Sequence, residues 1–405
     1  MSRIGAAVGI RSTTNPRRRA CLLAATFVLL SAAAPAATDT LAPDTEARWV
    51  FFDLTPGNQI RFAMTVDGRP VTAILDTGVS YTALSRSYVD AHRLAVRRGG
   101  SASAIGGVVP IGWIDTRAMQ IGGLTRAGGS ISVATLPANA TGSTRPIELL
   151  VGRDLLEGYA LDIDYDARRF RLLPSGRMPF LGATAPLAVS RDRLVYVGEV
   201  TLNGRRMRPM IVDTGDGNAI TFSAEAWSTA RLVARARTST ISFGLGGAIV
   251  TDLAILDELA TGTLIARNVE VQLEPARGFS QAMGMAGRIG SGFLQNYRVL
   301  LDPTAGHMVL KPGARADLPP LRSTSGLLVA AEPDRLRVLH VMRGSPAAQG
   351  EWRAGDLICM VDDMPIPQDY AGSAMASWSI GDTGRVVAFD MCDGSKRRLA
   401  LRNFY

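Results

Sequence analysis

Apolar and polar residues alternate along short stretches of the 405-residue chain, and this period of two predicts a mainly β protein. Residues 65–75, TVDGRPVTAIL, form two such stretches on either side of Asp67-Gly68, a pair typical of tight hairpin turns. Residues 200–212, VTLNGRRMRPMIV, repeat the arrangement with Asn-Gly at the turn. Helical periodicity is rare, and helices are predicted only over the windows 85–92, 153–156 and 224–232.

The chain contains an internal repeat with a period near 137 residues. The tripeptide Asp-Thr-Gly ends an apolar stretch at Asp76 and again at Asp213, 137 positions later. Downstream, Gly152 and Gly290 each follow apolar residues and are 138 positions apart. Two further hairpin-like patterns, YALDIDYDARRFRLL and YRVLLDPTAGHMVLKP, also recur at an offset of 138. Agreement in order, spacing and residue type indicates two similar halves.

The first 36 residues have the pattern of a removable export signal. Arg17-Arg18-Arg19 precede a short apolar stretch and an Ala-Pro-Ala site at residues 34–36. The apolar stretch is shorter than the roughly 20 residues of a membrane span, so an uncleaved anchor is the weaker alternative. The segment holds five arginines and no acidic residue, so its removal lowers the formal net charge from +8 to +3. The remaining charges are intermixed, which argues against a nucleic-acid partner.

Cysteine and histidine are sparse. Cys21 lies within the export segment, which leaves Cys359 and Cys392 near the C-terminus. One disulfide between these two residues is an option in an oxidising compartment, and we favour the alternative of two separate buried thiols. The three histidines are far apart and lack cysteine partners, so we expect neither a metal site nor a cofactor.

At the two Asp-Thr-Gly stretches the sequence resembles the aspartic proteases, in particular the bacterial aspartyl proteases similar to retropepsins. The family pattern is a strand that runs into Asp-Thr-Gly and, much further on, two apolar residues before a Gly and a short helix. Here ILDTG is followed by LLVG at residues 149–152, and MIVDTG by a shorter match, RIG, at residues 288–290. The resemblance covers about residues 50–312 and implies a two-lobed, duplicated β fold.

The resemblance also implies that Asp76 and Asp213 form a catalytic pair. Two carboxyl groups held close together share one proton. The ionised group then takes a proton from a bound water, while the protonated group hydrogen-bonds the scissile carbonyl. This chemistry needs no metal and no covalent intermediate.

Neighbouring residues are expected to support the pair. By resemblance, Thr77 and Thr214 brace the two loops through hydroxyl-to-backbone hydrogen bonds. Gly78 and Gly215 remove side chains where the backbones approach closely. The Leu-Leu-Val-Gly segment and Ile289-Gly290 pack behind the loops, and an ordinary core role is the alternative reading of these apolar residues.

Two departures from the family pattern bear on the working pH. Pepsin-like enzymes usually place Ser or Thr after Asp-Thr-Gly, where the hydroxyl stabilises an ionised Asp, whereas Val79 follows the first copy here. Without that donor the pair should hold its proton to higher pH, so weakly acidic to neutral operation is expected. Asp216 follows the second copy and either raises the pKa of the pair further or points to solvent. A third Asp-Thr-Gly, at Asp382, lacks the apolar approach and is interpreted as a turn.

Glycine pairs mark two candidate flaps. Gly106-Gly107 and Gly246-Gly247 each lie between an Asp-Thr-Gly and its downstream motif. In the resembling family a mobile hairpin covers the substrate at this place, and a plain surface hairpin is an equal alternative.

Beyond a proline-containing linker at residues 315–320, the chain resembles a bacterial PDZ domain. The match consists of Gly344-Ser345-Pro346-Ala347-Ala348, which starts a short helix, and Arg353-Ala354-Gly355-Asp356, which leads into a strand at residues 357–361. PDZ domains bind a peptide by adding it as a strand, often with its C-terminal carboxylate on backbone amides. The candidate binding residues are Gly326, Leu327 and Leu328. Packing on the protease or a role in assembly is the alternative.

The sequence thus predicts a mainly β, exported aspartic endopeptidase that acts on protein or peptide substrates in the bacterial periplasm or outside the cell. No nucleic acid and no membrane span after signal cleavage are expected, and a C-terminal peptide is the expected ligand of the PDZ domain. One alternative is a weakly active or inactive peptide-binding scaffold, and another is a structural protein whose halves each pair with another chain. The expected domains are a signal peptide (1–36), two protease lobes (37–180 and 181–313) and a PDZ domain, a partly open β-barrel with helices (320–405).

Overall fold

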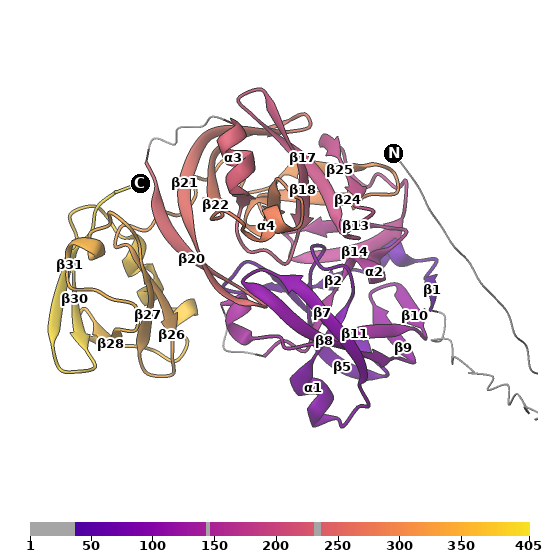
Figure 1. Cartoon of the computed structure of the whole chain (residues 1–405), viewed down its shortest axis with the longest axis horizontal. Coiled ribbons are helices and arrows are strands. Elements are labelled where there is room, and N and C mark those ends of the chain that lie inside the picture. The colour runs from indigo at the N-terminus through magenta and orange to yellow at the C-terminus, as the bar shows by residue number, and fades with distance from the viewer. Residues whose placement is uncertain (1–36, 143–145, 231–235) are drawn as a thin grey trace, which may run out of the picture. The chain divides into compact units, whose positions relative to one another are not determined.

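The computed structural model describes residues 37–142, 146–230 and 236–405, and it is mainly β, as the alternating pattern predicts (Figure 1). The expected export segment, residues 1–36, lies outside the described residues. In the described part of the chain, no helix is long and apolar enough to cross a membrane.

The first sheet is built around the hairpin of β4 (Ile60–Val66) and β5 (Arg69–Leu75). The turn residues Asp67 and Gly68 have φ angles of 51° and 79°, the left-handed values that this hairpin turn requires. β12 (Leu149–Val151) lies parallel to β5. The other strands of this sheet are β1 (Thr38–Leu41), β3 (Asp53–Leu54), β6 (Ala83–Ser85), β7 (Arg97–Ala104), β8 (Gly107–Asp115), β9 (Ala118–Ile121), β10 (Leu124–Ala127) and β11 (Ser130–Ala134).

A sheet in the second half of the chain has corresponding central pairings. β17 (Tyr196–Leu202) and β18 (Arg205–Asp213) form a hairpin whose turn, Asn203-Gly204, again has positive φ angles of 48° and 72°. β23 (Gly287–Gly290) lies parallel to β18, as β12 does to β5. The other strands are β16 (Ala188–Val189), β19 (Ile220–Phe222), β20 (Thr238–Gly244), β21 (Gly247–Thr261) and β22 (Leu264–Leu273).

Hairpins from both halves share a further sheet. β13 (Tyr159–Asp164) pairs antiparallel with β24 (Tyr297–Asp302), which places Leu161 opposite Leu301. One hydrophobic core runs through all three sheets and includes Leu75 and Val212, which precede the two Asp-Thr-Gly loops. Shared pairing and shared core fix the two loops relative to each other. The remaining strands of this sheet are β2 (Val50–Phe51), β14 (Arg169–Pro174), β15 (Ala183–Pro186) and β25 (His307–Pro312).

The helices are short, and three of them fall in the predicted windows. α1 (Arg86–Ala91) begins where the hydroxyl of Ser85 accepts the amide of Tyr88 at 3.1 Å. α2 (Arg153–Leu156) has the predicted bounds, and α3 (Ala224–Ala230) ends just before residues 231–235, which lie outside the described residues. Two further helices flank β23, namely α4 (Phe279–Ala282) and α5 (Ser291–Leu294).

Residues 320–405, termed the C-terminal module below, have their own sheet and their own hydrophobic core. The turn interpretation of the third Asp-Thr-Gly is confirmed, because Asp382 is exposed and its carbonyl accepts the amide of Arg385 at 3.1 Å. A 3-10 helix, η5 (Ala374–Ile380), precedes it. The strands of the module are β26 (Leu327–Ala331), β27 (Leu336–Val341), β28 (Leu357–Val361), β29 (Met364–Pro365), β30 (Val386–Met391) and β31 (Lys396–Ala400).

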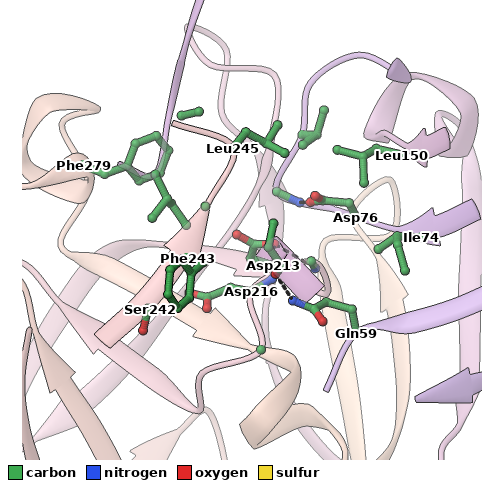
Figure 2. A pocket seen from close by; sticks show the side chains of 18 of the residues that line it. Gln59, Ile74, Asp76, Leu150, Asp213, Asp216, Ser242, Phe243, Leu245 and Phe279 are labelled. Carbon is green, nitrogen blue, oxygen red and sulfur yellow. Dashed lines mark hydrogen bonds between the residues drawn. The ribbon is translucent and has the colours of Figure 1, made fainter. Parts of the chain in front are cut away.

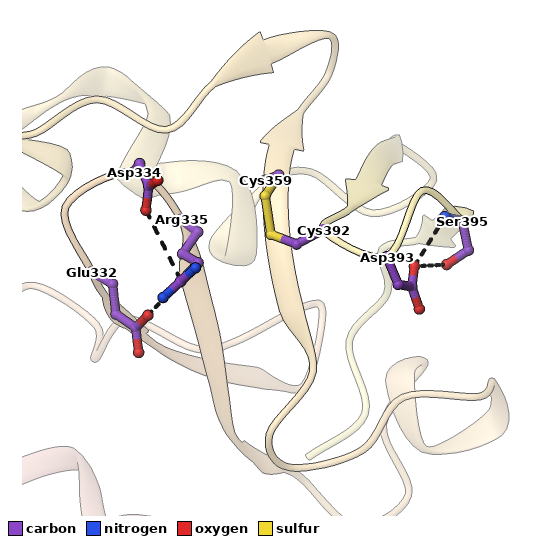
Figure 3. Close-up of a disulfide and its surroundings, with 7 residues drawn as sticks. All are labelled: Glu332, Asp334, Arg335, Cys359, Cys392, Asp393 and Ser395. Carbon is purple, nitrogen blue, oxygen red and sulfur yellow. Dashed lines mark hydrogen bonds and ion pairs between the residues drawn. A yellow bond between two sulfur atoms is a disulfide. The ribbon is translucent and has the colours of Figure 1, made fainter.

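Cys359 and Cys392 form a disulfide, so the favoured expectation of two separate thiols is wrong (Figure 3). Cys359 lies in β28 and Cys392 directly follows β30, and these strands pair antiparallel with Ile358 opposite Met391. The register brings the two Cα atoms to 5.1 Å, within the range that a disulfide spans. Because strand register decides this proximity, spacing along the chain alone did not reveal it.

Candidate active site

The two Asp-Thr-Gly loops face each other and bring Asp76 and Asp213 into one site (Figure 2). Each carboxyl lies against the glycine of the opposite loop. A methyl group added to Gly78 would lie 2.3 Å from Cγ of Asp213, and one added to Gly215 would lie 2.2 Å from Cγ of Asp76. Only glycine leaves room for this approach.

The threonines of the two loops form a reciprocal brace. The amide of Thr77 donates to Oγ1 of Thr214 at 3.1 Å, and the amide of Thr214 donates to Oγ1 of Thr77 at 3.0 Å. Each hydroxyl in turn donates to the chain before the opposite aspartate, Thr77 to the carbonyl of Val212 and Thr214 to the carbonyl of Leu75. All four groups are buried, so the expected hydroxyl-to-backbone bracing is present and fully paired.

The downstream motifs lie directly behind the loops. The amide of Asp76 donates to the carbonyl of Val151 at 3.0 Å, and Asp213 stands opposite Gly290 in the pairing of β18 with β23. Both glycines of these motifs are tightly enclosed, since a methyl group on Gly152 would lie 2.7 Å from the amide of Thr82. These parallel pairings therefore set the position at which each aspartate leaves its strand.

Both aspartates hold protons more strongly than an ordinary carboxyl group. Burial, followed by the charge of Asp213, raises the pKa of Asp76 well above its usual range. Burial, followed by the charge of Asp216, raises the pKa of Asp213 to about 6, and Arg288 acts in the opposite direction. Two close carboxyls with raised pKa values can share one proton near neutral pH, which suits general acid–base chemistry.

Asp216 points into the protein, so of the two alternatives the solvent-facing one is wrong. Its Oδ2 accepts Nε of Arg288 at 2.7 Å, and its Oδ1 accepts the amide of Asn218 at 3.0 Å. Arg288 is fully buried and also donates to Glu274 and to the hydroxyl of Ser280. Asp216, Arg288 and Glu274, termed the ionic triad below, thus form one buried network beside Asp213.

The first half of the chain has apolar residues at the positions of the ionic triad. Val79, Leu136 and Leu150 precede Asp216, Glu274 and Arg288 by 137 or 138 residues, which is the period of the repeat. Leu136 and Leu150 belong to one apolar cluster, and Val79 packs against it. Sequence reasoning missed Arg288 and Glu274 as site residues. A comparison of the two halves, position by position, would have revealed three charges that replace apolar residues.

The two glycine-rich hairpins meet at their tips. These are β7–β8, with Gly106 in its turn, and β20–β21, with Gly246 in its turn, and the amide of Gly246 donates to the carbonyl of Ile105 at 2.9 Å. A methyl group on Gly246 would lie 2.2 Å from the amide nitrogen of Gly107. The tips therefore touch through backbone atoms, an approach that the glycines permit.

A cavity of about 1020 Å³ contains both aspartates. Ile105 and Leu245, from the two hairpin tips, also line it. Figure 2 shows Phe243 and Leu245 from the second hairpin together with Asp76 and Asp213. A cavity of this size accommodates several side chains of an extended peptide.

The three candidate peptide-binding residues of the C-terminal module have different surroundings. Leu328 lines the cavity that holds the aspartates. By contrast, the amides of Gly326 and Leu327 donate to the hydroxyls of Ser323 and Ser325, at 2.9 and 3.1 Å. A carboxylate that bound these two amides would have to displace the serine hydroxyls.

Within residues 37–142, 146–230 and 236–405, no group of three or more His, Cys, Asp and Glu side chains is arranged to hold a metal ion. The geometry of the site is set by the two carboxyls, the glycines that face them and the threonine brace.

Comparison with known proteins gives one finding that bears on this site. The family model described as aspartyl protease matches residues 62–155, a segment that contains Asp76, its strand β5 and the backing strand β12. No curated protein matches the chain. Residues 62–155 are thus similar to the aspartyl protease family, and this similarity suggests a peptidase function.

Proposed function

We propose that the protein is an exported aspartic endopeptidase in which Asp76 and Asp213 act as one catalytic dyad. The observation that carries the proposal is the close packing of the two carboxyls, each against the glycine of the other loop. The family match to the segment around Asp76 supports it independently. Residues 37–180 and 181–313 would be the two lobes of a duplicated protease fold, and the corresponding pairings of β12 with β5 and of β23 with β18 support that division.

The mechanism follows from the shared proton. The ionised carboxyl removes a proton from a water molecule between the two aspartates, while the protonated carboxyl donates a hydrogen bond to the scissile carbonyl. Water attacks the carbonyl carbon and forms a tetrahedral diol. The diol collapses as a proton passes to the leaving nitrogen, and the dyad returns to its singly protonated state. The threonine brace keeps both carboxyls in place throughout, because its hydrogen bonds involve backbone groups on both loops.

The β7–β8 and β20–β21 hairpins would serve as flaps over the bound peptide. Their tip-to-tip hydrogen bond between Gly246 and Ile105, together with cavity-lining residues on both tips, supports this role over that of plain surface hairpins. Closed flaps exclude bulk water and hold the peptide against the dyad.

A peptide-binding scaffold without activity is the second candidate. Two departures from the family pattern in the second half would favour it, Asp216 after the Asp-Thr-Gly and Arg288 in the shorter downstream motif. These residues pair with each other at 2.7 Å, so each has an ionic partner. The pairing removes the main reason to expect an inactive dyad.

The C-terminal module would be a PDZ domain that captures a peptide on the free edge of β26, the outermost strand of its sheet. Export to the periplasm or the exterior rests on the sequence of residues 1–36. The disulfide between Cys359 and Cys392 is consistent with an oxidising compartment.

The proposal is tested by incubating the purified mature chain with an unfolded polypeptide and following cleavage by mass spectrometry. Wild type should cleave, a statine-type peptide should inhibit it, and Asp76→Asn should neither cleave nor bind the inhibitor with the same affinity. Peptide binding without dyad-dependent cleavage at any pH would support the scaffold instead.

A further inference from the structure

The three residues of the ionic triad occupy positions at which the first half of the chain has apolar residues. Stability alone does not explain this difference. Asp216, Glu274 and Arg288 are all less than 7% exposed. Desolvation of buried ion pairs often outweighs their attraction, and apolar residues of similar size commonly do as well or better. The apolar cluster of Val79, Leu136 and Leu150 shows that this fold accommodates such residues at the equivalent positions. A buried charge kept beside a catalytic carboxyl therefore points to a role in the reaction.

The triad also changes the hydrogen bonds that the dyad receives. Oδ1 of Asp213 accepts two amides, from Gly215 at 2.9 Å and from Asp216 at 3.0 Å. In the first half, the amide of Gly78 donates to Oδ1 of Asp76 at 3.0 Å. The amides of Val79 and Asp216 each donate to the main-chain carbonyl of the aspartate three positions earlier at 3.3 Å, and the bond to Oδ1 is an addition in the second loop. The two carboxyls thus have different surroundings although their loops are alike in sequence.

Arg288 holds Asp216 in the position that produces this difference. Its guanidinium fixes the carboxylate of Asp216 from β23, and the same side chain is fixed on its far side by Glu274 and Ser280. The side chain of Asp216 cannot turn away without breaking a charge-assisted hydrogen bond in a buried site. Its amide is therefore kept on Asp213 and its charge is kept next to the dyad.

We propose that Asp216, anchored by Arg288, is a positioning residue that makes the two carboxyls of the dyad inequivalent and sets the pH at which the dyad takes up its shared proton. This inference rests on the proposed function only for its catalytic consequence. The amides of Gly215 and Asp216 stabilise the ionised form of Asp213 by hydrogen bonding, so the shared proton resides on Asp76. The carboxylate of Asp216 opposes that charge from close by and delays its formation to higher pH.

Besides the dyad and Asp216, the charged residues Asp192, Arg193 and Glu270 line the cavity. Among charged groups, Asp216 and Arg288 have the largest effects on the pKa of Asp213. Asp213 faces Asp76 from the first loop, Asp216 from its own loop and Arg288 from β23. Asp216 comes before Arg288 among the influences on the pKa of Asp213, so its loss should lower that pKa. Glu274 accepts Nη1 of Arg288, whereas Asp216 accepts Nε, so Glu274 contacts the arginine but not the second Asp-Thr-Gly loop.

The test is a titration by ¹³C NMR of the protein labelled at aspartate Cγ, in wild type, Asp216→Asn and Glu274→Gln. Each variant removes one of the two buried carboxylates that bind Arg288. Glu274→Gln therefore shows how much of any pKa change comes from general destabilisation of this network. We expect the lower apparent pKa of the dyad to fall by about half a unit or more in Asp216→Asn and to stay within about 0.2 units of wild type in Glu274→Gln. Asp216→Ser removes the same charge with a smaller side chain and should shift the dyad in the same direction if Asp216→Asn does not fold.

An unchanged or raised dyad pKa in the Asp216 variants would overturn the proposal, as would an equal shift in Glu274→Gln. The titration needs no turnover, so it separates the two claims. A protein that cleaves only with Asp76 present but shows no shift refutes this inference alone. A protein that shows the shift but never cleaves refutes the proposed function alone. In an active protein, the acidic limb of the kcat/KM profile of Asp216→Asn should move to lower pH with the NMR value.

Discussion

The amide of Thr214 donates to the hydroxyl of Thr77 at 3.0 Å, and the amide of Thr77 donates to the hydroxyl of Thr214 at 3.1 Å. Each Asp-Thr-Gly loop is therefore held in place by a side chain from the other half of the chain. Both threonines are fully buried. No solvent can replace a partner that is lost from this brace. The position of each catalytic candidate therefore depends on a side chain about 137 residues away.

Removal of one brace hydroxyl should destabilise the protein as well as the site. In Thr214→Val, the amide of Thr77 and the carbonyl of Leu75 both lose a buried partner, which should cost about 1–3 kcal/mol of unfolding free energy. Thr214→Ser keeps the hydroxyl and should lose much less. Urea unfolding of the two variants measures the difference. Equal stability of Thr214→Val and wild type would show that the brace is not needed.

The loop glycines should be essential for activity. A methyl group in Gly215→Ala would lie 2.2 Å from Cγ of Asp76 and must push the two carboxyls apart. A displacement of about 1 Å in a catalytic group lowers kcat about 100-fold, so at least that loss is expected. Gly100→Ala is the matched control, because a methyl group there meets nothing within 4 Å. Normal peptide cleavage by Gly215→Ala would contradict the close-packed dyad.

Contact between the hairpin tips should control how well the site holds substrate. Gly246→Ala places a methyl group 2.2 Å from the amide nitrogen of Gly107, and Gly246 has no positive φ angle, so its backbone is not strained by alanine. We expect the tips to separate and kcat/KM for a long peptide to fall about tenfold, mainly through KM. The thermal unfolding midpoint should stay near that of wild type. A normal KM would identify the hairpins as surface features without a flap role.

The raised pKa values of the dyad predict a distinct dependence of stability on pH. The pKa of Asp213 is raised to about 6, so the folded protein binds more protons than the unfolded chain between about pH 4 and pH 6. The stabilisation from this carboxyl is present below about pH 4 and is lost as the pH rises through about 6. Asp213→Asn does not titrate, so its stability relative to wild type should increase over this window by on the order of 3 kcal/mol. Urea unfolding at several pH values gives this difference, and a constant offset across the window would contradict the raised pKa.

Catalytic activity should follow the same ionisation. The dyad needs one proton lost and one retained, so kcat/KM should rise as the pH increases through about 6. Such a profile agrees with the weakly acidic to neutral operation expected from Val79. A maximum near pH 2 to 3, about where an ordinary carboxyl is still protonated, would contradict it.

Much of this site could be predicted because its requirements are local. Asp67-Gly68 and Asn203-Gly204 adopt the positive φ angles of tight hairpins, which are preferences of single residues. Asp76 and Asp213 were recognised by the apolar strand before them and the apolar-Gly motif after them. Repetition of these local patterns indicated two halves without any knowledge of how the strands pair.

The features that escaped prediction depend on contacts between distant segments. Arg288 appeared to shorten a motif, and Asp216 appeared out of place, because their pairing joins residues 72 positions apart. Glu274 gave no local signal, since its role is to contact Arg288. The disulfide between Cys359 and Cys392 likewise depends on the register of β28 and β30. In each case the physical cause is tertiary proximity, which a single sequence encodes only through the fold.

The central claim is that Asp76 and Asp213 act as one unit, and the most direct test is kcat/KM for one peptide in Asp76→Asn, Asp213→Asn and the double variant. Each single variant should lose about 1000-fold or more, because neither carboxyl can then share a proton, and the double variant should lose little further. Near wild-type cleavage by either single variant, or losses that multiply in the double variant, would contradict the dyad.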